Sequence, residues 1–196
     1  APRASRDVLV SNPDRQLVFF GTETTVGSQS SQDAMFIRFS DQENIAEWEP
    51  LSTNTAGSLR CSAGSEIIGG VRARQETLIY TDVALYSLQF IGPPNTFGLV
   101  LINEGVSLIG PNAAINTPNG IFWMDKKGFY TYSGSVQKLL CSVEEHVFSN
   151  LNETQNMPIE DSSIDAGLIV AGWQYLQYPE KVSLELSRII KADSLL

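Results

Sequence analysis

The sequence predicts an all-β protein, and within that class a β-propeller built from hairpin repeats of about 41–43 residues. Two observations support this prediction. Short aromatic and β-branched segments alternate with turns rich in Gly, Pro, Asn and Ser, and helical periodicity is almost absent. Three such segments end on an aspartate, at Asp41, Asp82 and Asp125, so the intervals are 41 and 43 residues. Unrelated hairpins in a β-sandwich would give a similar pattern and remain the alternative.

The repeats are expected as hairpins, taken here in chain order. The first segment is FIRFSD, which ends at Asp41. The second is TLIYTD, which ends at Asp82 and is followed by LYSLQF; the third is GIFWMD, which ends at Asp125 and is followed by FYTYSG. Each Asp is predicted to be a structural turn residue that starts the link between two strands. Its carboxylate should then accept backbone N–H bonds from the next three residues.

Two segments near the C-terminal end differ from this pattern. The stretch SVEEHVFSNLNE (142–153) is predicted to be helical, whereas PEKVSLELSRIIKADSLL (179–196) fits a strand and a helix equally well. Residues 1–155 are therefore assigned to propeller blades and residues 156–196 to a separate C-terminal segment. At about 42 residues a blade, the chain would supply between four and five blades, which favours part of a larger ring.

Composition limits the functional classes. The chain has 13 basic and 22 acidic side chains, a net charge of −9, which argues against tight nucleic-acid binding. No apolar run approaches the ~18 residues of a membrane-spanning helix, so membrane insertion is not expected. Cys61 and Cys141 lack a CxxC spacing and are interpreted as two buried free thiols, with a disulfide as the alternative.

Residue types suited to catalysis are sparse. His146 is the only histidine, and no nucleophile motif, metal-ligand cluster or phosphate-binding loop accompanies it. We therefore expect no enzyme activity, no catalytic residue, no metal and no cofactor. The stretch SDQENIAEW (40–48) resembles the Asp-box turn of sialidases, so a carbohydrate-active or carbohydrate-binding propeller is the alternative function. Trp48, Trp123 and Trp173 are expected to pack in the core, with a sugar-stacking platform as the alternative.

Longer phrases carry a family resemblance over residues 2–155. The phrases are PRASRDVLVS (2–11), RQLVFFGT (15–22), FIRFSDQENIAEWEPLSTNTAGSLRCSAGSEI (36–67), TLIYTDVALYSLQFIGPPNTFG (77–98), SLIGPNAAI (107–115) and GIFWMDKKGFYTYSGSVQKLLCSVEEHVFSNLNETQ (120–155). In this order they closely resemble the tail nozzle proteins of short-tailed bacteriophages, also called phage stabilisation or tail tubular proteins.

The resemblance implies a structural virion protein built around a β-propeller. In that family six copies form the ring that ends the tail tube, beneath an adaptor ring protein, and this ring carries tail fibres or spikes. The genome passes through its lumen without specific binding, and the tail is assembled in the host cytoplasm. Nozzle proteins are longer than this chain, so the sequence is expected to be part of a longer polypeptide, with residues omitted between positions 155 and 165.

A ring that releases DNA should not hold phosphates, because each cationic contact adds salt-dependent affinity. Lumen-facing residues are therefore expected to be acidic or neutral. Lys126, Lys127 and Lys138 should face outward or bridge neighbouring subunits. A further expectation concerns the loop Pro93–Pro94–Asn95, which should be exposed and contact another subunit, because proline stiffens such a loop.

Overall fold

The computed structural model describes residues 1–12, 14–92, 94–142 and 144–149. The chain divides into two compact units, 1–142 and 143–196. Within the second unit the described part is the short helix α1 (Glu144–Ser149), which confirms the helix predicted near residue 142. Pro93, Trp173, the segment 156–196 and the expected omission after residue 155 lie outside the described residues.

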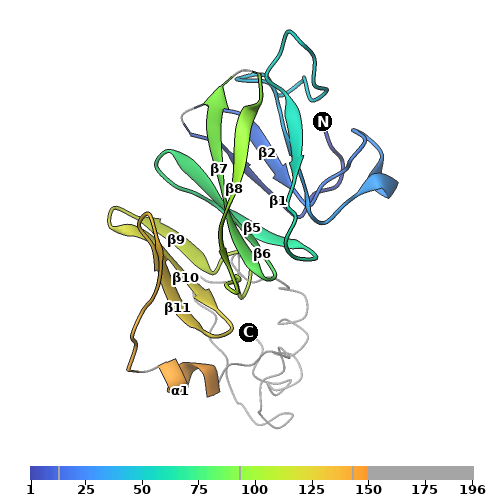
Figure 1. The fold of residues 1–196 in the computed structure, drawn as a ribbon. Coiled ribbons are helices and arrows are strands. Elements are labelled where there is room, and N and C mark those ends of the chain that lie inside the picture. The colour runs from blue at the N-terminus through green and yellow to red at the C-terminus, as the bar shows by residue number, and fades with distance from the viewer. Residues whose placement is uncertain (13, 93, 143, 150–196) are drawn as a thin grey trace, which may run out of the picture. The chain divides into compact units, whose positions relative to one another are not determined.

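The first unit confirms the all-β prediction. It contains three antiparallel four-stranded sheets, each made of four consecutive strands (Figure 1). None of these described sheets closes on itself. Sheet 1 comprises β1 (Asp7–Val10), β2 (Leu17–Phe20), β3 (Phe36–Phe39) and β4 (Gly57–Arg60); sheet 2 comprises β5 (Ile67–Arg72), β6 (Glu76–Thr81), β7 (Ala84–Gly92) and β8 (Thr96–Glu104); sheet 3 comprises β9 (Ala114–Thr117), β10 (Gly120–Asp125), β11 (Gly128–Tyr132) and β12 (Val136–Lys138).

The sheets correct the alignment of the repeats. Asp82 lies between β6 and β7, and Asp125 ends β10 before β11, so both follow the second strand of their sheet. Asp41 follows β3, the third strand of sheet 1, and is not equivalent to them. The interval of 43 residues is thus a structural repeat, whereas the interval of 41 is not. The reason is the connection 21–35, which separates β2 from β3 and contains the 3-10 helix η1 (Gln29–Ser31).

The first strands of sheets 1 and 2 lie side by side and run in the same direction. The Asp7 carboxylate at the start of β1 accepts a hydrogen bond of 3.0 Å from the Gly70 N–H in β5. Before both of these residues in the chain, Arg6 forms an ion pair of 2.5 Å with Glu66. Moving forward along β1 therefore moves forward along β5.

The same relation joins β5 to β9. A Cβ on Gly69, near the start of β5, would lie 3.2 Å from the Pro111 carbonyl oxygen before β9. Further along, the Asn116 side-chain amide donates to the Arg72 carbonyl at 2.8 Å. Contacts between the backbones of different sheets are concentrated on these first strands. The three sheets are thus neighbours through β1, β5 and β9.

Two glycines permit this close approach. A Cβ on Gly70 would lie 2.8 Å from the Phe20 ring, and a Cβ on Gly69 would press on the chain before β9. Cβ contacts below about 3.0 Å force a shift of the neighbouring atoms, because protein interiors are close-packed. The Gly69–Gly70 pair therefore lets β5 contact sheet 1 on one side and sheet 3 on the other.

Sheet 2 is covered by apolar contacts on both faces. Successive side chains of a strand point to opposite faces, and β6 follows this rule: Ile79 belongs to the core shared with sheet 1, and Leu78 and Tyr80 to the core shared with sheet 3. We call these cores junction 1 and junction 2. Junction 1 contains Val18, Phe20, Ile37, Phe39, Ile67, Ile79, Tyr86 and Leu88, and junction 2 contains Leu78, Tyr80, Leu85, Val106, Leu108, Ile121 and Trp123.

Several further expectations are settled by burial. Trp48 and Trp123 are each 3% exposed, which confirms the core interpretation for these two. Cys61 and Cys141 are free thiols, as predicted, although Cys141 is only partly buried. Burial raises the pKa of the Cys61 thiol to about 12. No helix in the described ranges is long and apolar enough to cross a membrane.

Candidate functional site

The strand order gives unit 1 two distinct ends. Because the strands of each sheet alternate in direction and β1, β5 and β9 run together, the turns β5–β6, β9–β10 and β11–β12 lie at one end. We call it the groove end. The turns β6–β7 and β10–β11, with the segments that lead into β1 and β5, lie at the other end, which we call the network end.

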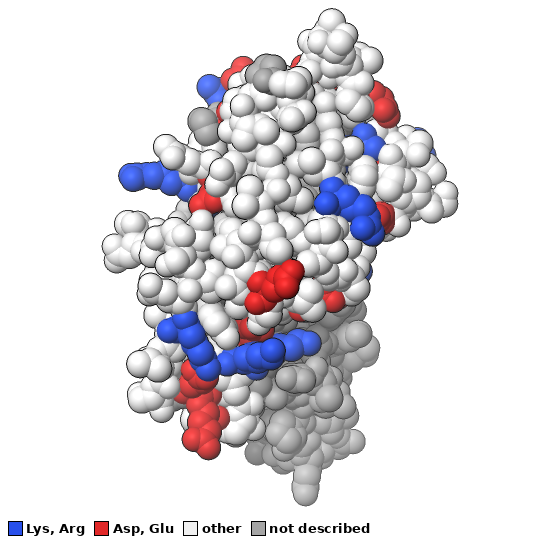
Figure 2. Space-filling model, viewed as in Figure 1, with Lys and Arg blue, Asp and Glu red and all other residues white. Residues whose placement is uncertain are grey.

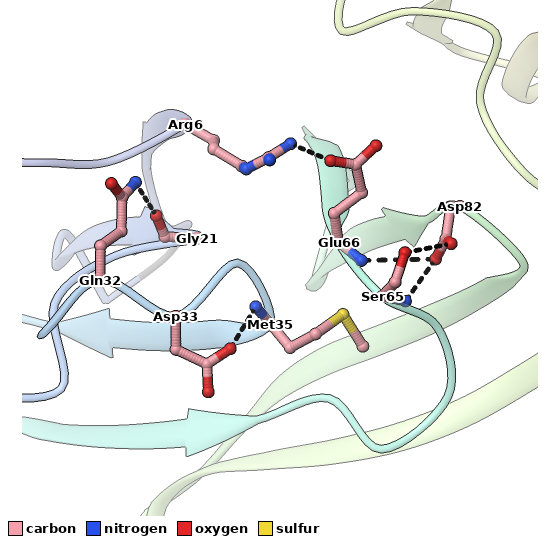
Figure 3. A network of polar contacts seen from close by, with 8 residues as sticks. All are labelled: Arg6, Gly21, Gln32, Asp33, Met35, Ser65, Glu66 and Asp82. Atoms are coloured by element: carbon pink, nitrogen blue, oxygen red, sulfur yellow. Dashed lines mark hydrogen bonds and ion pairs between the residues drawn. The ribbon is translucent and has the colours of Figure 1, made fainter.

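A polar network ties sheet 1 to sheet 2 at the network end (Figure 3). The Asp82 carboxylate accepts the Ser65 N–H at 2.8 Å and the Ser65 hydroxyl at 2.7 Å, and the Glu66 N–H adds a longer bond. Burial alone would raise the pKa of Asp82, but these hydrogen bonds outweigh it, so the pKa lies below its usual value. Asp82 thus fixes the segment that enters β5.

The prediction that Asp82 caps its own turn is wrong. The Thr81 hydroxyl performs that role, because it accepts the N–H of Ala84 at 2.9 Å and that of Val83 at 3.3 Å. With these donors taken, the carboxylate of Asp82 is free to bond across to Ser65. The sequence could not distinguish the two, since Thr and Asp both form such side-chain bonds to the backbone.

The other two aspartates are also engaged locally, each in its own way. Asp41 accepts the Thr55 N–H at 2.8 Å and the Thr55 hydroxyl at 2.7 Å, which closes the long β3–β4 connection at its base. These bonds, foremost the one from the hydroxyl, lower the pKa of Asp41, and the Gln42 N–H contributes as well. Asp125 accepts the N–H of Lys126, the next residue, as the turn prediction requires. The three aspartates belong to turns of three different sheets.

The stretch that resembles an Asp-box is a self-bonded loop. Trp48 donates its indole N–H to the Ile45 carbonyl at 2.7 Å and packs edge-to-face on Phe19, with ring centroids 4.9 Å apart. Beneath it lies Arg38, which is 4% exposed. Its guanidinium donates to backbone carbonyls in two connections, 21–35 and 40–56. Burial lowers the pKa of Arg38. These side chains hold loops on the outer face of sheet 1.

A polar hollow lies at the groove end, between sheets 2 and 3. It is an open groove of about 800 Å³, formed where four hairpin connections meet. Glu76 lies in it, with its carboxylate accepting the Ser87 hydroxyl and the Gln89 amide. Tyr132 from β11 also hydrogen-bonds to Glu76. Burial, followed by the charge of Glu76, raises the pKa of the Tyr132 hydroxyl. Around this cluster the groove is lined by Asn12, Arg72, Arg74, Gln75, Asn116, Thr117, Asn119 and Ser133.

Sequence reasoning missed this groove. Arg72 and Arg74 looked like scattered basic residues, and nothing in the local pattern links them to Tyr132, some sixty positions later. One local signal exists, because side chains two apart at the end of a strand point to the same side. Their meeting with Asn116 and Tyr132 depends on how β5 and β9 pack, which no local pattern encodes.

The predicted subunit-contact loop lies at the turn between β7 and β8. Pro94 and Asn95 are exposed there. They border a second hollow of about 780 Å³, between β4 and the β7–β8 hairpin. Contact with another subunit remains a prediction.

Charged side chains are dispersed elsewhere. Figure 2 shows acidic and basic residues interspersed over one largely uncharged face of the molecule. Lys126, Lys127 and Lys138 are exposed. His146 lies on α1, and no cluster of three metal-ligating side chains occurs in the ranges that the structure describes. The groove is therefore a place in unit 1 where unlike polar groups converge around an open hollow.

No protein-family model and no curated protein matches the chain. Any family assignment thus depends on the ordered phrases of the sequence and on the arrangement of the sheets.

Proposed function

We propose that this chain is a structural subunit of a short bacteriophage tail, part of the nozzle ring through which the genome is ejected. The observation that carries the proposal is the ordered set of phrases across residues 2–155 that resemble tail nozzle proteins. This role is structural and not enzymatic, because a ring subunit needs surfaces that pack against its neighbours and needs no reactive centre. In the virion the partners would be further copies in a hexameric ring, the tail adaptor ring protein, and tail fibres or spikes.

We further propose that sheets 1, 2 and 3 are consecutive blades of a β-propeller. A blade is a four-stranded antiparallel sheet whose first strand lies nearest the central channel. Each described sheet is a four-stranded meander, and β1, β5 and β9 lie side by side in the same direction. Sheet 2 has a neighbour on each face, as an internal blade must.

The outer face of sheet 3 supports a ring of more than three blades. Phe122 and Met124 on β10 point away from junction 2, since their neighbours Ile121 and Trp123 point into it. They line an apolar hollow of about 530 Å³, together with Ile115, which is 63% exposed. Burying such a face against a further sheet would be favourable by about 25 cal/mol per Å² of apolar surface.

The charge distribution is compatible with the passage of DNA. Lys126 and Lys127 are exposed at the β10–β11 turn, at the network end, and the chain is strongly acidic overall. A lumen of neutral and acidic residues would not retain phosphates, because phosphate neutralisation by Lys and Arg supplies most non-specific affinity. The expected orientation of these lysines, outward or toward a neighbouring subunit, is part of the proposal.

Electron microscopy of the purified chain tests the ring. Sixfold rings are expected, and Asn95→Arg in the predicted contact loop should reduce their number. Asn112→Arg, at an exposed position outside that loop, is the matched control and should leave the rings intact. A protein that stays monomeric at every concentration would contradict the proposal. If that monomer also cleaves glycans, the carbohydrate-active alternative is favoured.

A further inference from the structure

The groove between sheets 2 and 3 carries a positive charge in a strongly acidic protein. Two guanidinium groups, those of Arg72 and Arg74, line it against a single carboxylate, that of Glu76. The chain as a whole has a net charge of −9. A local reversal of sign in an open groove attracts an anionic group from solution.

The two arginines are available to a ligand. Arg72 ends β5 and Arg74 follows two residues later at the tip of the β5–β6 hairpin, and both side chains are exposed. Neither forms an ion pair within the part of the chain that the structure describes. A guanidinium suits carboxylates and phosphates in particular, since its planar fork can donate two parallel hydrogen bonds.

Glu76, in contrast, is held in place. The Ser87 hydroxyl, the Gln89 amide and Tyr132 all bond to its carboxylate, and Ser87 is 1% exposed. These bonds hold the carboxylate in place among the groove residues. A fixed carboxylate with lone pairs to spare is an acceptor for ligand hydroxyl groups.

The remaining lining consists of neutral hydrogen-bonding groups and small apolar surfaces. The amides of Asn12 and Asn119 come from the β1–β2 and β9–β10 turns. Asn116 uses its amide N–H on the Arg72 carbonyl, so its side-chain oxygen remains as an acceptor. Amides recognise hydroxyl groups both as donors and as acceptors, and the ring of Tyr132 offers a flat face. The volume of about 800 Å³ falls in the range of ligand sites.

We propose that this groove binds an anionic saccharide. Its carboxylate or phosphate would lie against Arg72 and Arg74, while its hydroxyl groups would bond to Glu76 and to the asparagine amides. The composition disfavours nucleic acid, which needs a continuous track of cations along the backbone. The inference goes beyond the proposed tail function and does not depend on it, because it uses only groups at the groove end of sheets 2 and 3.

Calorimetric titration of the whole chain tests the site with defined probes. The carboxylated probe is a hyaluronan tetrasaccharide, the neutral probe is cellotetraose, and the anion alone is inorganic phosphate. We expect the carboxylated tetrasaccharide to bind at least about tenfold more tightly than either of the others, a difference of about 1.4 kcal/mol. A phosphorylated oligosaccharide that binds more tightly than the carboxylated one would assign the anionic group as phosphate and still support the site.

Matched charge removals locate the binding. The double variant Arg72→Gln/Arg74→Gln should bind the hyaluronan tetrasaccharide about tenfold or more weakly than the unchanged protein. Lys126→Gln with Lys127→Gln removes the same charge from two exposed side chains at the network end and should leave the affinity unchanged. Circular dichroism checks that both double variants are folded.

Four results would overturn the proposal. They are the absence of binding by any saccharide probe, equal affinity for phosphate alone, equal loss in the two double variants, and tighter binding of a single-stranded oligonucleotide than of the tetrasaccharide.

Discussion

Junctions 1 and 2 are built on the two faces of the same sheet, yet they treat buried polar groups differently. In junction 1 the Tyr86 hydroxyl is buried and bonded, because it accepts the Ala63 N–H at 2.6 Å. In junction 2 the Tyr80 hydroxyl and the Trp123 indole N–H are buried and have no hydrogen-bond partner among the described residues. The two rings meet edge-to-face, with centroids 5.4 Å apart. In the part of the chain that the structure describes, junction 2 therefore contains two buried donors without a partner, whereas the single tyrosine of junction 1 is hydrogen-bonded.

The junctions also differ in how their ends are held. Junction 1 is fastened beside β1 by the Asp7–Gly70 hydrogen bond and by the Arg6–Glu66 ion pair. Junction 2 opens at the groove end into the hollow around Glu76. One repeated sheet arrangement can thus supply both a sealed contact and an accessible site. Whether a junction is closed or open to solvent depends on the residues on the two faces of the sheet and not on the position of the sheet in the repeat.

The largest expected effect on stability comes from a substitution in the core of junction 1. Phe20 is fully buried and contacts β5 at Gly70. Phe20→Ala should lower the free energy of unfolding by about 3–5 kcal/mol, because it removes apolar contacts and leaves a cavity. Chemical denaturation measures the change. Phe90→Ala, at a ring that is 39% exposed, is the control and should cost less. Equal losses in the two variants would show that junction 1 is not the main core.

A second variant overfills the same contact. Gly70→Ala places a methyl group 2.8 Å from the Phe20 ring, which is too close for an ordinary contact, so the free energy of unfolding should fall by about 1–3 kcal/mol. Phe20→Leu removes the ring atoms that clash, and in that background Gly70→Ala should cost less. The coupling follows from a double-mutant cycle of denaturation measurements. Simple additivity would contradict the close packing of β5 on sheet 1.

The clearest contrast between the junctions comes from two matched changes. Tyr86→Phe leaves the Ala63 N–H without its acceptor and should destabilise the protein by about 1 kcal/mol. Tyr80→Phe removes a buried hydroxyl that has no partner, so it should be neutral or stabilise by up to about 1 kcal/mol. Thermal and chemical denaturation give both values. The same sign in both variants would remove the distinction drawn between the junctions.

The smallest expected effect is on the stability of the protein at acidic pH. The pKa of Asp82 is lowered in the folded state, so the unfolded state binds more protons between that pKa and the ordinary value of about 3.9. Stability from this group is therefore present above about pH 4 and is lost as the pH falls through the folded pKa. Asp82→Asn should flatten the acid dependence of unfolding, and Ser65→Ala should flatten it partly. Unchanged slopes in both variants would contradict the role of the network.

Sequence patterns predicted the strands best where local preference and tertiary structure agree. The runs 76–81 and 120–125 are rich in aromatic and β-branched residues, and both are strands followed by tight turns. Asp41 was misaligned because the long connection 21–35 separates β2 from β3, so this aspartate follows the third strand of its sheet and not the second. Strand β5 contains Gly69 and Gly70, which disfavour strands locally and are explained only by the sheets that press on them.

The candidate site was less predictable than the fold. Its residues come from turns of three sheets, and each turn by itself has the composition of an ordinary surface loop. Glu76 gains its character from Ser87 and Tyr132, which only the pairing of β6 with β7 and the packing of sheet 3 bring near. The sequence of a turn predicts the backbone conformation of that turn. It does not predict which distant residues the turn will contact, and those contacts form the site.

The way the first strands meet also bears on the order of folding. All strand pairs in unit 1 join neighbours in sequence, so each sheet can form from a short stretch of chain. The Asp7–Gly70 hydrogen bond, in contrast, joins residues 63 positions apart. Closing so long a loop costs more conformational entropy than closing a hairpin. We therefore expect sheet 1 to assemble while the following residues are still being synthesised, and the docking of β5 against β1 to complete the junction afterwards.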